Sequence, residues 1–415
     1  MKAMGSQLGA QSVLLGSDFK SLAATRSLSR RGVRVTLVDS DPRPAWYSRH
    51  VARRMRWFTN LGDPALVDKL LESARSEGLA GAVLFPMQDD AVELVSRNHQ
   101  RLSSAFVLTT PPWESLRRAH VKALVNQAAD AVGVDHPATW QPLSEDELAS
   151  LPVRFPAIVK PAVSTALVNA LHRKALFAGT REQLVEQYRL AARYVPASEV
   201  LVQEFVPGGG EAQLSFCGVV DAGRVLGYMT ARRLRQYPID FGLSSSFVEA
   251  IELPQLIAPS TRLLEQLELS GLVEIEFKRH AKTGVLHLLD VNVRAWAWHE
   301  LCTAAGIDMI DLEFRRVTGE AIPRVAPRYG LRWRRTVTDI LAGFALMRAG
   351  QVSVASYLRS VRGRTVHSTL DLRDPLPAMA DLPVAAIRLA KRVTKYRRPA
   401  TTAGYSAKHS PGPSQ

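Results

Sequence analysis

The first hundred residues alternate short apolar runs with amphipathic segments, a pattern that predicts strands and helices in turn. Four apolar runs have the length of buried strands, at 12–15, 33–38, 82–85 and 106–108. Residues 18–31 and 90–102 have the spacing of helices. Strands that alternate with helices indicate a parallel sheet with right-handed crossovers. The turn after the first strand holds Gly16 alone, without the three glycines of a dinucleotide site, so a Rossmann-like lobe with another use is favoured.

The pattern becomes less regular beyond residue 110. Residues 111–134 are predicted to be helical and 136–142 to be a linker, and 157–320 mix strands and helices in an α+β pattern. From Arg324 onward the sequence is rich in arginine, and glycine and proline interrupt its helical segments. We therefore expect four parts, at 1–110, 111–323, 324–400 and a disordered tail at 401–415.

A predicted β-hairpin carries four polar side chains on matching faces. Its strands are residues 273–278 and 285–292. Successive side chains of a strand point to opposite faces. The polar positions therefore share one face of each strand, Glu274 with Glu276 and Asp290 with Asn292.

Carboxylates and an amide clustered in this way are hard oxygen ligands, suited to a Mg²⁺ ion that also holds phosphate oxygens. Asp290 follows an apolar run, and a charge that emerges from a buried strand is costly unless it meets a partner or a metal. Arg294 extends the same face and suits an oxyanion. The alternative, a solvated hairpin whose charges meet only water, stays open at this point.

Two further segments suit a nucleotide. The strand at 155–161, FPAIVKP, places the Lys160 ammonium at the carboxyl end of a sheet, where phosphates often bind. Lys174 follows on the next predicted strand, where a plain surface lysine is nearly as good an interpretation. Residues 200–211, VLVQEFVPGGGE, predict a strand that ends in a Pro-Gly corner, with backbone groups left for a planar base and Glu211 for a ribose.

Composition is typical of a globular protein, with 46% hydrophobic and 22% charged residues. The cysteines are Cys217 and Cys302 alone, without a CxxC pair, which favours a reducing compartment and argues against a zinc site or a disulfide framework. The N-terminus lacks the apolar region of a signal peptide, and the apolar stretch at 340–347 is too short to span a membrane. These features predict a cytoplasmic protein.

The net charge of +14 comes almost entirely from the C-terminal part. From Arg324 onward there are 17 Lys and Arg against 4 Asp and Glu, whereas the first 323 residues hold 36 against 35. Residues 384–398, VAAIRLAKRVTKYRR, predict a helix with one apolar and one basic face, the layout of a helix that lies on an anionic membrane. A helix packed on the body with its basic face in water explains the pattern equally well. No nucleic-acid partner is expected, because no known binding module is present.

The order of these segments resembles the ATP-grasp superfamily. Strand-Lys160, then QEFVPGGGE, then the EIEF and LLDVNVR strands follow its pattern, and the spacing of 14 from Glu276 to Asp290 before Asp-x-Asn-x-Arg matches its metal-binding motif. The resemblance covers residues 12–320 and is greatest to the predicted carboxylate–amine ligases, near D-aspartate ligase and the large-subunit domains of carbamoyl phosphate synthetase. It implies an ATP-grasp fold, α/β and α+β, with an N-terminal Rossmann-like pre-ATP-grasp domain, ATP between two lobes of 111–323, and a basic helical C-terminal extension.

The resemblance also implies a role for each matching residue. The ATP phosphates would be held by Lys122 and Lys160, with Lys174 as a further candidate. The adenine hinge would be Gln203, Glu204 and Val206, with Glu211 on the ribose. The ligands of Mg²⁺, or of Mn²⁺ in its place, would be Glu276, Asp290 and Asn292. The transferred phosphoryl group would be stabilised by Arg294 and Lys160. The run Arg232, Arg233 and Arg235 resembles the RxRQYP stretch of the ligase group and would contact the carboxylate substrate, with a solvated arginine run as an equal alternative.

The implied reaction transfers a phosphoryl group from ATP to a carboxylate, after which an amine attacks the acyl phosphate to form an amide or peptide-like bond. Its partners would be a small-molecule carboxylate and amine, and the superfamily's frequent dimers imply a homodimer. Two alternatives stay open: a carboxylase that activates bicarbonate, and a catalytically silent nucleotide-binding regulator at the membrane. The second is favoured by the absence of glycine from residues 161–174, where a phosphate-covering loop is expected.

Overall fold

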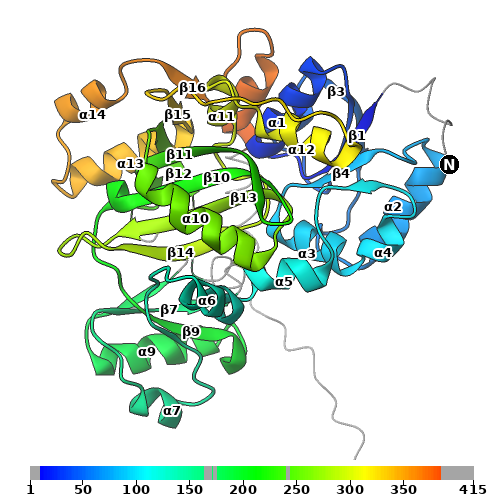
Figure 1. Ribbon diagram of the computed structural model, residues 1–415. Helices are drawn as coiled ribbons and strands as arrows, with labels where there is room; N and C mark the ends of the chain where they lie inside the picture. The colour runs from blue at the N-terminus through cyan, green and yellow to red at the C-terminus, as the bar shows by residue number, and fades with distance from the viewer. Residues whose placement is uncertain (1–9, 163–170, 172–174, 240–243, 385–415) are drawn as a thin grey trace, which may run out of the picture.

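The computed structural model describes residues 10–162, 171, 175–239 and 244–384. Figure 1 shows a central sheet with an N-terminal lobe beside it and a small lobe below it. The predicted helix at 384–398 and Lys174 lie outside the described residues, apart from Val384.

The N-terminal lobe is a parallel sheet of five strands in the order β3-β2-β1-β4-β5. The strands are β1 Gln11–Leu15, β2 Arg34–Asp39, β3 Val51–Arg56, β4 Val83–Pro86 and β5 Val107–Leu108. The helices around them are α1 Phe19–Arg30, α2 Ala65–Ser76, α3 Asp89–Arg97 and α4 His99–Leu102, with the 3-10 turn η1 Pro44–Tyr47. The inner strands read as continuous apolar runs because both faces of the sheet are covered. This confirms the predicted parallel sheet.

Strand β3 was not predicted from the sequence. Its residues, VARRMR, alternate between buried and exposed positions and carry three arginines. It is the edge strand of the sheet, and charged side chains on an edge discourage pairing with other chains. A polar edge strand lacks the apolar run that identified its neighbours.

Helices α5 Trp113–His120 and α6 Lys122–Ala131 lead into the small lobe. Its antiparallel sheet has the order β6-β9-β7-β8, with β6 Thr139–Trp140, β7 Ala157–Pro161, β8 Leu176–Ala178 and β9 Val200–Glu204. Helices α7 Glu145–Ser150 and α9 Arg181–Ala192 and the turn η2 Ala197–Glu199 complete the lobe. Apolar residues of β7, β8 and β9 pack against α9, so the strand that carries Lys160 is anchored from one side.

The central sheet has seven strands in the order β14-β13-β10-β11-β12-β15-β16. They are β10 Gln213–Asp221, β11 Arg224–Tyr237, β12 Ser244–Ala250, β13 Gly271–Arg279, β14 Leu286–Asn292, β15 Arg332–Arg334 and β16 Thr365–His367. The helices are α10 Pro254–Leu267, α11 Glu300–Ala304, α12 Met309–Thr318, α13 Thr336–Arg348 and α14 Val354–Ser360, with the turn η3 Gly210–Ala212. All pairs are antiparallel except β15 with β16.

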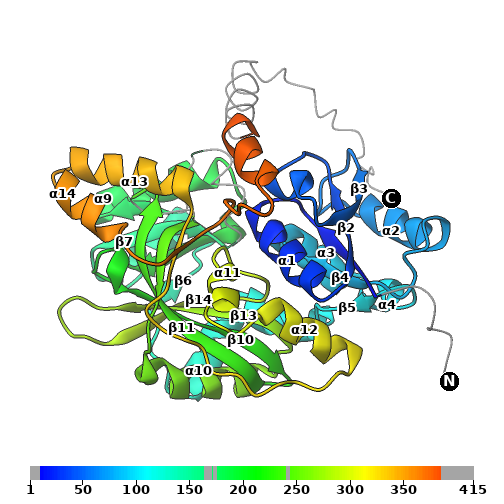
Figure 2. The ribbon, with the colours of Figure 1, turned by 90° about the horizontal axis from the view of Figure 1, so that it is seen from above.

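Each face of the central sheet buries its own core. One core joins the sheet to α11, α12 and the N-terminal lobe, and it includes Trp296 and Trp298. The other lies between the sheet and α6 and α10. Figure 2 shows α12 beside α1, which places the N-terminal lobe directly against the sheet that carries the predicted metal hairpin.

The chain beyond residue 323 is part of this architecture. Strands β15 and β16 extend the central sheet, and α13 packs on β11. Residues 376–384 are helical as well. Among the helices of the described segments, none is long and apolar enough to cross a membrane.

Candidate functional site

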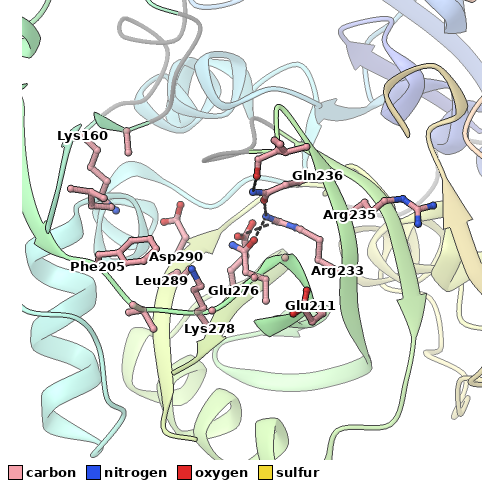
Figure 3. Close-up of a pocket in the computed structure, with 18 of the residues that line it drawn as sticks. Lys160, Phe205, Glu211, Arg233, Arg235, Gln236, Glu276, Lys278, Leu289 and Asp290 are labelled. Atoms are coloured by element: carbon pink, nitrogen blue, oxygen red, sulfur yellow. Dashed lines mark hydrogen bonds and ion pairs between the residues drawn. The ribbon is translucent and has the colours of Figure 1, made fainter. Parts of the chain in front are cut away.

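A cavity of about 790 Å³ lies between the small lobe and the central sheet. Ten of the residues singled out from the sequence line it: Lys122, Lys160, Gln203, Glu204, Val206, Glu211, Arg233, Arg235, Glu276 and Asp290. The volume is within the range of small-molecule sites. Figure 3 shows the Lys160 side chain directed toward Asp290, with Arg233 beside Glu276.

The hairpin of β13 and β14 has the register that the alternation predicts. Glu276 lies opposite Asp290, and Glu274 lies opposite Asn292. The Asn292 amide donates hydrogen bonds from Nδ2 to Glu274 and to Glu276, each at 3.3 Å. Glu274, Glu276 and Asn292 therefore form one hydrogen-bonded cluster. Asp290, beside them, is exposed to the cavity.

The surroundings of Glu274 raise the pKa of its carboxyl group. Burial, together with repulsion from Glu276, raises the pKa of Glu274 to about 7. A buried carboxyl beside a second carboxylate holds its proton more tightly, because the ionised pair is costly in a medium of low dielectric constant. The cluster is thus rich in negative charge and suited to a cation.

The chemistry of the donors fits Mg²⁺. Carboxylate and amide oxygens are the ligands that this ion takes, together with water and phosphate oxygens. Since Asn292 uses its nitrogen toward the two glutamates, its carbonyl oxygen is the atom left for a cation. Within the described part of the chain no three His, Cys, Asp or Glu side chains converge as a metal cluster, so a cation here would complete its shell with phosphate or water oxygens.

Two lysines approach the same hairpin from other elements. Lys122, the first residue of α6, donates from Nζ to the carbonyl oxygen of Leu289. Burial lowers the pKa of Lys122, while Asp290 and Glu276 oppose the shift. Lys160 is half-buried on β7, where it pairs with Leu201 of β9. Lys122 therefore lies near the two carboxylates, and Figure 3 shows Lys160 directed toward Asp290.

The three residues of the predicted adenine hinge lie at the wall of the cavity. Gln203 is buried, and its Nε2 donates to Thr139 at 2.8 Å. Glu204 is half-buried and Val206 buried, both at the wall of the cavity. Glu211 follows in η3, exposed at the far end.

The structure separates the three arginines of β11. Arg232 forms an ion pair with Glu249 at 2.8 Å and does not line the cavity. Arg235 is 8% exposed and forms a two-point ion pair with Asp339, at 2.7 and 3.0 Å. Arg233 donates to Ser245 and Gln236 and forms an ion pair with Glu276 at 3.4 Å. Of the three, Arg233 is the one that reaches the carboxylate cluster.

Arg294 lies beyond the end of β14 and turns to the N-terminal lobe. Its Nη2 donates to the Asp89 carboxylate at 3.1 Å, and its Nε contacts the other oxygen of the same group. Burial opposes the charge of Arg294, but Asp89 and the two glutamates raise the pKa of the guanidinium. Arg294 is thus held as a cation at the junction of the two lobes.

Lys278 and Phe205 also line the cavity and were not singled out from the sequence. Lys278 continues the alternation of Glu274 and Glu276 on β13, and its Nζ lies 4.7 Å from the centre of the Phe205 ring. Burial, followed by the nearby Arg233, lowers the pKa of Lys278. The period of two along the strand is the signal that could have identified this lysine on the metal face. Phe205 carries no comparable signal, because an aromatic residue at a strand end is usually core.

Comparison with known proteins gives related sequences and folds. Residues 216–338 match the family described as ATP-grasp in the biosynthetic pathway with Ter operon. D-aspartate ligase of Enterococcus faecium is 24% identical over 340 residues, which cover 77% of this chain and 79% of that protein. The N-terminal section of the carbamoyl phosphate synthase large chain of Methanopyrus kandleri is 22% identical, over 79% of this chain and 56% of that section.

A solved structure has the same architecture. The biotin carboxylase domain of Hydrogenobacter thermophilus 2-oxoglutarate carboxylase, in complex with MgADP, ADP and bicarbonate, superposes with a TM-score of 0.63. It is 14% identical and covers 79% of this chain and 74% of its own. These findings confirm the resemblance inferred from Lys160, the Pro-Gly corner and the hairpin. The chain has the ATP-grasp fold, its residues 216–338 match an ATP-grasp family, and its relatives include a ligase.

Proposed function

We propose that this protein is an ATP- and Mg²⁺-dependent carboxylate–amine ligase. The observation that carries the proposal is the convergence of Lys122, Lys160, Arg233 and the Glu276–Asp290 pair on one cavity. The activity of the D-aspartate ligase relative agrees with it. Positive and negative groups arranged in this way suit a metal-bound triphosphate next to an anionic substrate.

The nucleotide would lie along the cavity from the hinge to the hairpin. The backbone of Gln203 and the walls formed by Glu204 and Val206 would meet the base, and Glu211 would meet the ribose. Lys122 and Lys160 would contact the phosphates. Lys174 remains a candidate for the same role, outside the described residues.

Mg²⁺ would be held by Glu276, Asp290 and Asn292, and it would supply charge neutralisation of the phosphate oxygens. The chain's own contribution is positional. Arg233, already in contact with Glu276, would orient the carboxylate substrate beside the terminal phosphate, and Arg294 would approach from the lobe junction. Little covalent chemistry is asked of the protein, since electrostatic stabilisation and alignment account for most of such catalysis.

The proposed reaction has two steps. A carboxylate oxygen of the substrate attacks the γ-phosphorus of ATP, the bond to the β–γ bridging oxygen breaks, and ADP leaves. The amine nitrogen then attacks the acyl carbon and loses a proton, and inorganic phosphate leaves with the former carboxylate oxygen. The products are an amide, ADP and phosphate.

The test is a screen for ADP release with pairs of amino acids as carboxylate and amine, and with bicarbonate as a separate arm. We expect release to need both organic substrates and to fall about 100-fold or more in Asp290→Asn and in Lys160→Met. The matched controls are Asp68→Asn and Lys282→Met, whose side chains are exposed and do not line the cavity.

Other results would select other functions. ADP release that needs bicarbonate in place of the organic carboxylate would indicate a carboxylase. Tight ATP binding without turnover across the whole panel would assign a silent nucleotide-binding protein. ADP release that persists unchanged in both variants would show that the reaction does not take place at this site.

A further inference from the structure

Helix α13 is packed with its polarity inverted. Its buried residues are Asp339, Ala342 and Gly343, whereas Ile340, Leu341 and Phe344 face outward with exposed fractions of 53%, 45% and 64%. A surface helix normally buries its apolar stripe and exposes its charges. On α14, Val354 and Leu358 are also more than half exposed. We call these five exposed side chains the α13–α14 face.

The orientation of the helix is set by a buried ion cluster. Asp339 is fully buried and accepts from Arg235 and from Arg334, the latter at 2.8 Å. The Tyr357 hydroxyl of α14 donates to the same carboxylate at 3.2 Å. A buried carboxylate without its partners would be strongly unfavourable, so Asp339 cannot rotate outward.

Close packing at Gly343 fixes the same orientation. A Cβ atom at this position would stand 2.3 Å from the Tyr357 ring. The two helices are thus held by Tyr357 on their inner side. The apolar α13–α14 face is left outward as a consequence, and a contiguous apolar face on a surface indicates an interaction site.

The charge around the face is positive. Arg348, Arg359, Arg362 and Arg364 are exposed around the two helices. Of the acidic residues between 336 and 384, three are buried and engaged in hydrogen bonds or ion pairs: Asp339, Asp374 and Asp381. Asp371 is half-buried. The partner that fits this surface is therefore apolar and anionic.

A second copy of the chain fits poorly. A two-fold contact through this face would bring the arginines of one copy near those of the other, and like charges across an interface are unfavourable. An anionic bilayer supplies both requirements, because its acyl boundary takes the Phe and aliphatic side chains while its headgroups meet arginine.

The neighbouring segment has the same character. Leu372, Leu376, Met379 and Leu382 are exposed, with Leu372 at 90%. In Figure 2, residues 376–384 lie between α13 and the N-terminal lobe. At its end begins the segment 384–398, for which the sequence predicts a basic amphipathic helix.

We propose that the α13–α14 face is a docking surface for an anionic phospholipid bilayer, with the arginines around it on the lipid headgroups. The contact is peripheral, since none of the described helices can span a bilayer. It has a consequence for the cavity. Leu346, Gln351 and Ser356 of the same helical pair line the ATP-grasp cavity, so docking would bring that cavity to the membrane surface. The inference does not depend on the proposed ligase reaction.

The experiment is flotation of the full chain with vesicles of phosphatidylglycerol and phosphatidylcholine in equal parts, beside vesicles of phosphatidylcholine alone. We expect flotation only with the anionic vesicles. The ratio of bound to free protein should fall about tenfold or more in Ile340→Ser with Phe344→Ser, and in Arg348→Glu with Arg359→Glu.

Two control variants make the same chemical changes elsewhere. Phe58→Ser removes an aromatic side chain that is 82% exposed in the N-terminal lobe, and Arg193→Glu reverses an exposed charge on the small lobe. Both should float like the unmodified chain. Circular dichroism and thermal melting of every variant identify any loss of folding.

Three results would overturn the proposal. In the first, the Ile340 and Phe344 double variant floats as well as the unmodified chain. In the second, Leu389→Ser with Val393→Ser abolishes flotation while the variants of the face retain it, which assigns binding to the tail. In the third, the chain does not float but forms a dimer that Phe344→Ser dissociates, which assigns the face to a second copy.

Discussion

The Arg294 guanidinium and the Asp89 carboxylate form a two-point ion pair across the junction between the central sheet and the N-terminal lobe. Arg294 follows the metal hairpin in sequence, whereas Asp89 begins helix α3 after strand β4. The pair therefore couples the proposed phosphoryl-transfer site to a lobe whose described residues, 10–110, do not line the cavity.

This coupling predicts non-additive kinetics. Arg294→Ala should lower kcat about 100-fold, because one preorganised stabiliser of transition-state charge is lost. Asp89→Ala should cost much less on its own, and it should add almost nothing in the Arg294→Ala background. The measurement is kcat/KM for the four proteins of the double-mutant cycle. Equal effects of Asp89→Ala in both backgrounds would show that the ion pair does not serve the reaction.

Lys278 should contribute to ATP binding. Its ammonium lies over the Phe205 ring at the wall of the cavity, a cation–π contact worth about 0.5–2 kcal/mol. Lys278→Met removes a positive charge from the wall of the cavity, so it should weaken binding of the anionic ATP about 3- to 10-fold in a calorimetric titration. Lys282→Met, four residues further along and exposed, is the control. An unchanged dissociation constant in Lys278→Met would place this lysine outside the nucleotide site.

Asp339 should be a major determinant of stability. Asp339→Ala leaves Arg235 and Arg334 without their shared carboxylate, and removal of one partner of a buried ion pair costs about 3–5 kcal/mol. The free energy of unfolding from urea denaturation measures the change. Asp371→Ala, at a half-buried position, should cost less than about 1 kcal/mol. A small effect at Asp339 would indicate that α13 is not held by this cluster.

Stability should depend on pH through Glu300. Burial raises the pKa of this carboxyl to about 7, against the opposing effect of Arg26, which lies 3.6 Å away. The native state therefore keeps a proton that the unfolded chain, with a pKa near 4.5, loses. Stability from this group is fully present below the lower value and is lost as the pH rises from 4.5 to 7, by up to about 3 kcal/mol.

Glu300→Gln removes the ionisation and keeps the size of the side chain. The variant should show a flatter dependence of the unfolding free energy on pH between pH 5 and 7, and it should gain relative to the parent at the upper end. Glu77→Gln is the control, because that side chain is exposed. The same slope in the parent and in Glu300→Gln would contradict the shift.

The elements that carry local signals could be predicted from the sequence alone. Apolar runs gave β1, β2 and β4, and alternation gave the faces of β13 and β14, so that the opposition of Glu276 and Asp290 followed once the two strands paired. These signals are local because side-chain direction in a strand depends only on position. The same period of two could have identified Lys278, which was missed.

Which charges are available to a ligand depends on contacts between distant parts of the folded chain. Arg232, Arg233 and Arg235 are near neighbours on one strand, but Glu249 and Asp339 engage two of them and leave Arg233 at Glu276. Those partners lie 17 and 104 residues away along the chain, so no local pattern names them. The inverted orientation of α13 has the same cause. The buried ion cluster at Asp339 joins residues that are distant in the sequence, and it outweighs the apolar stripe of the helix. The free energy of this cluster depends on burial, which exists only in the folded chain.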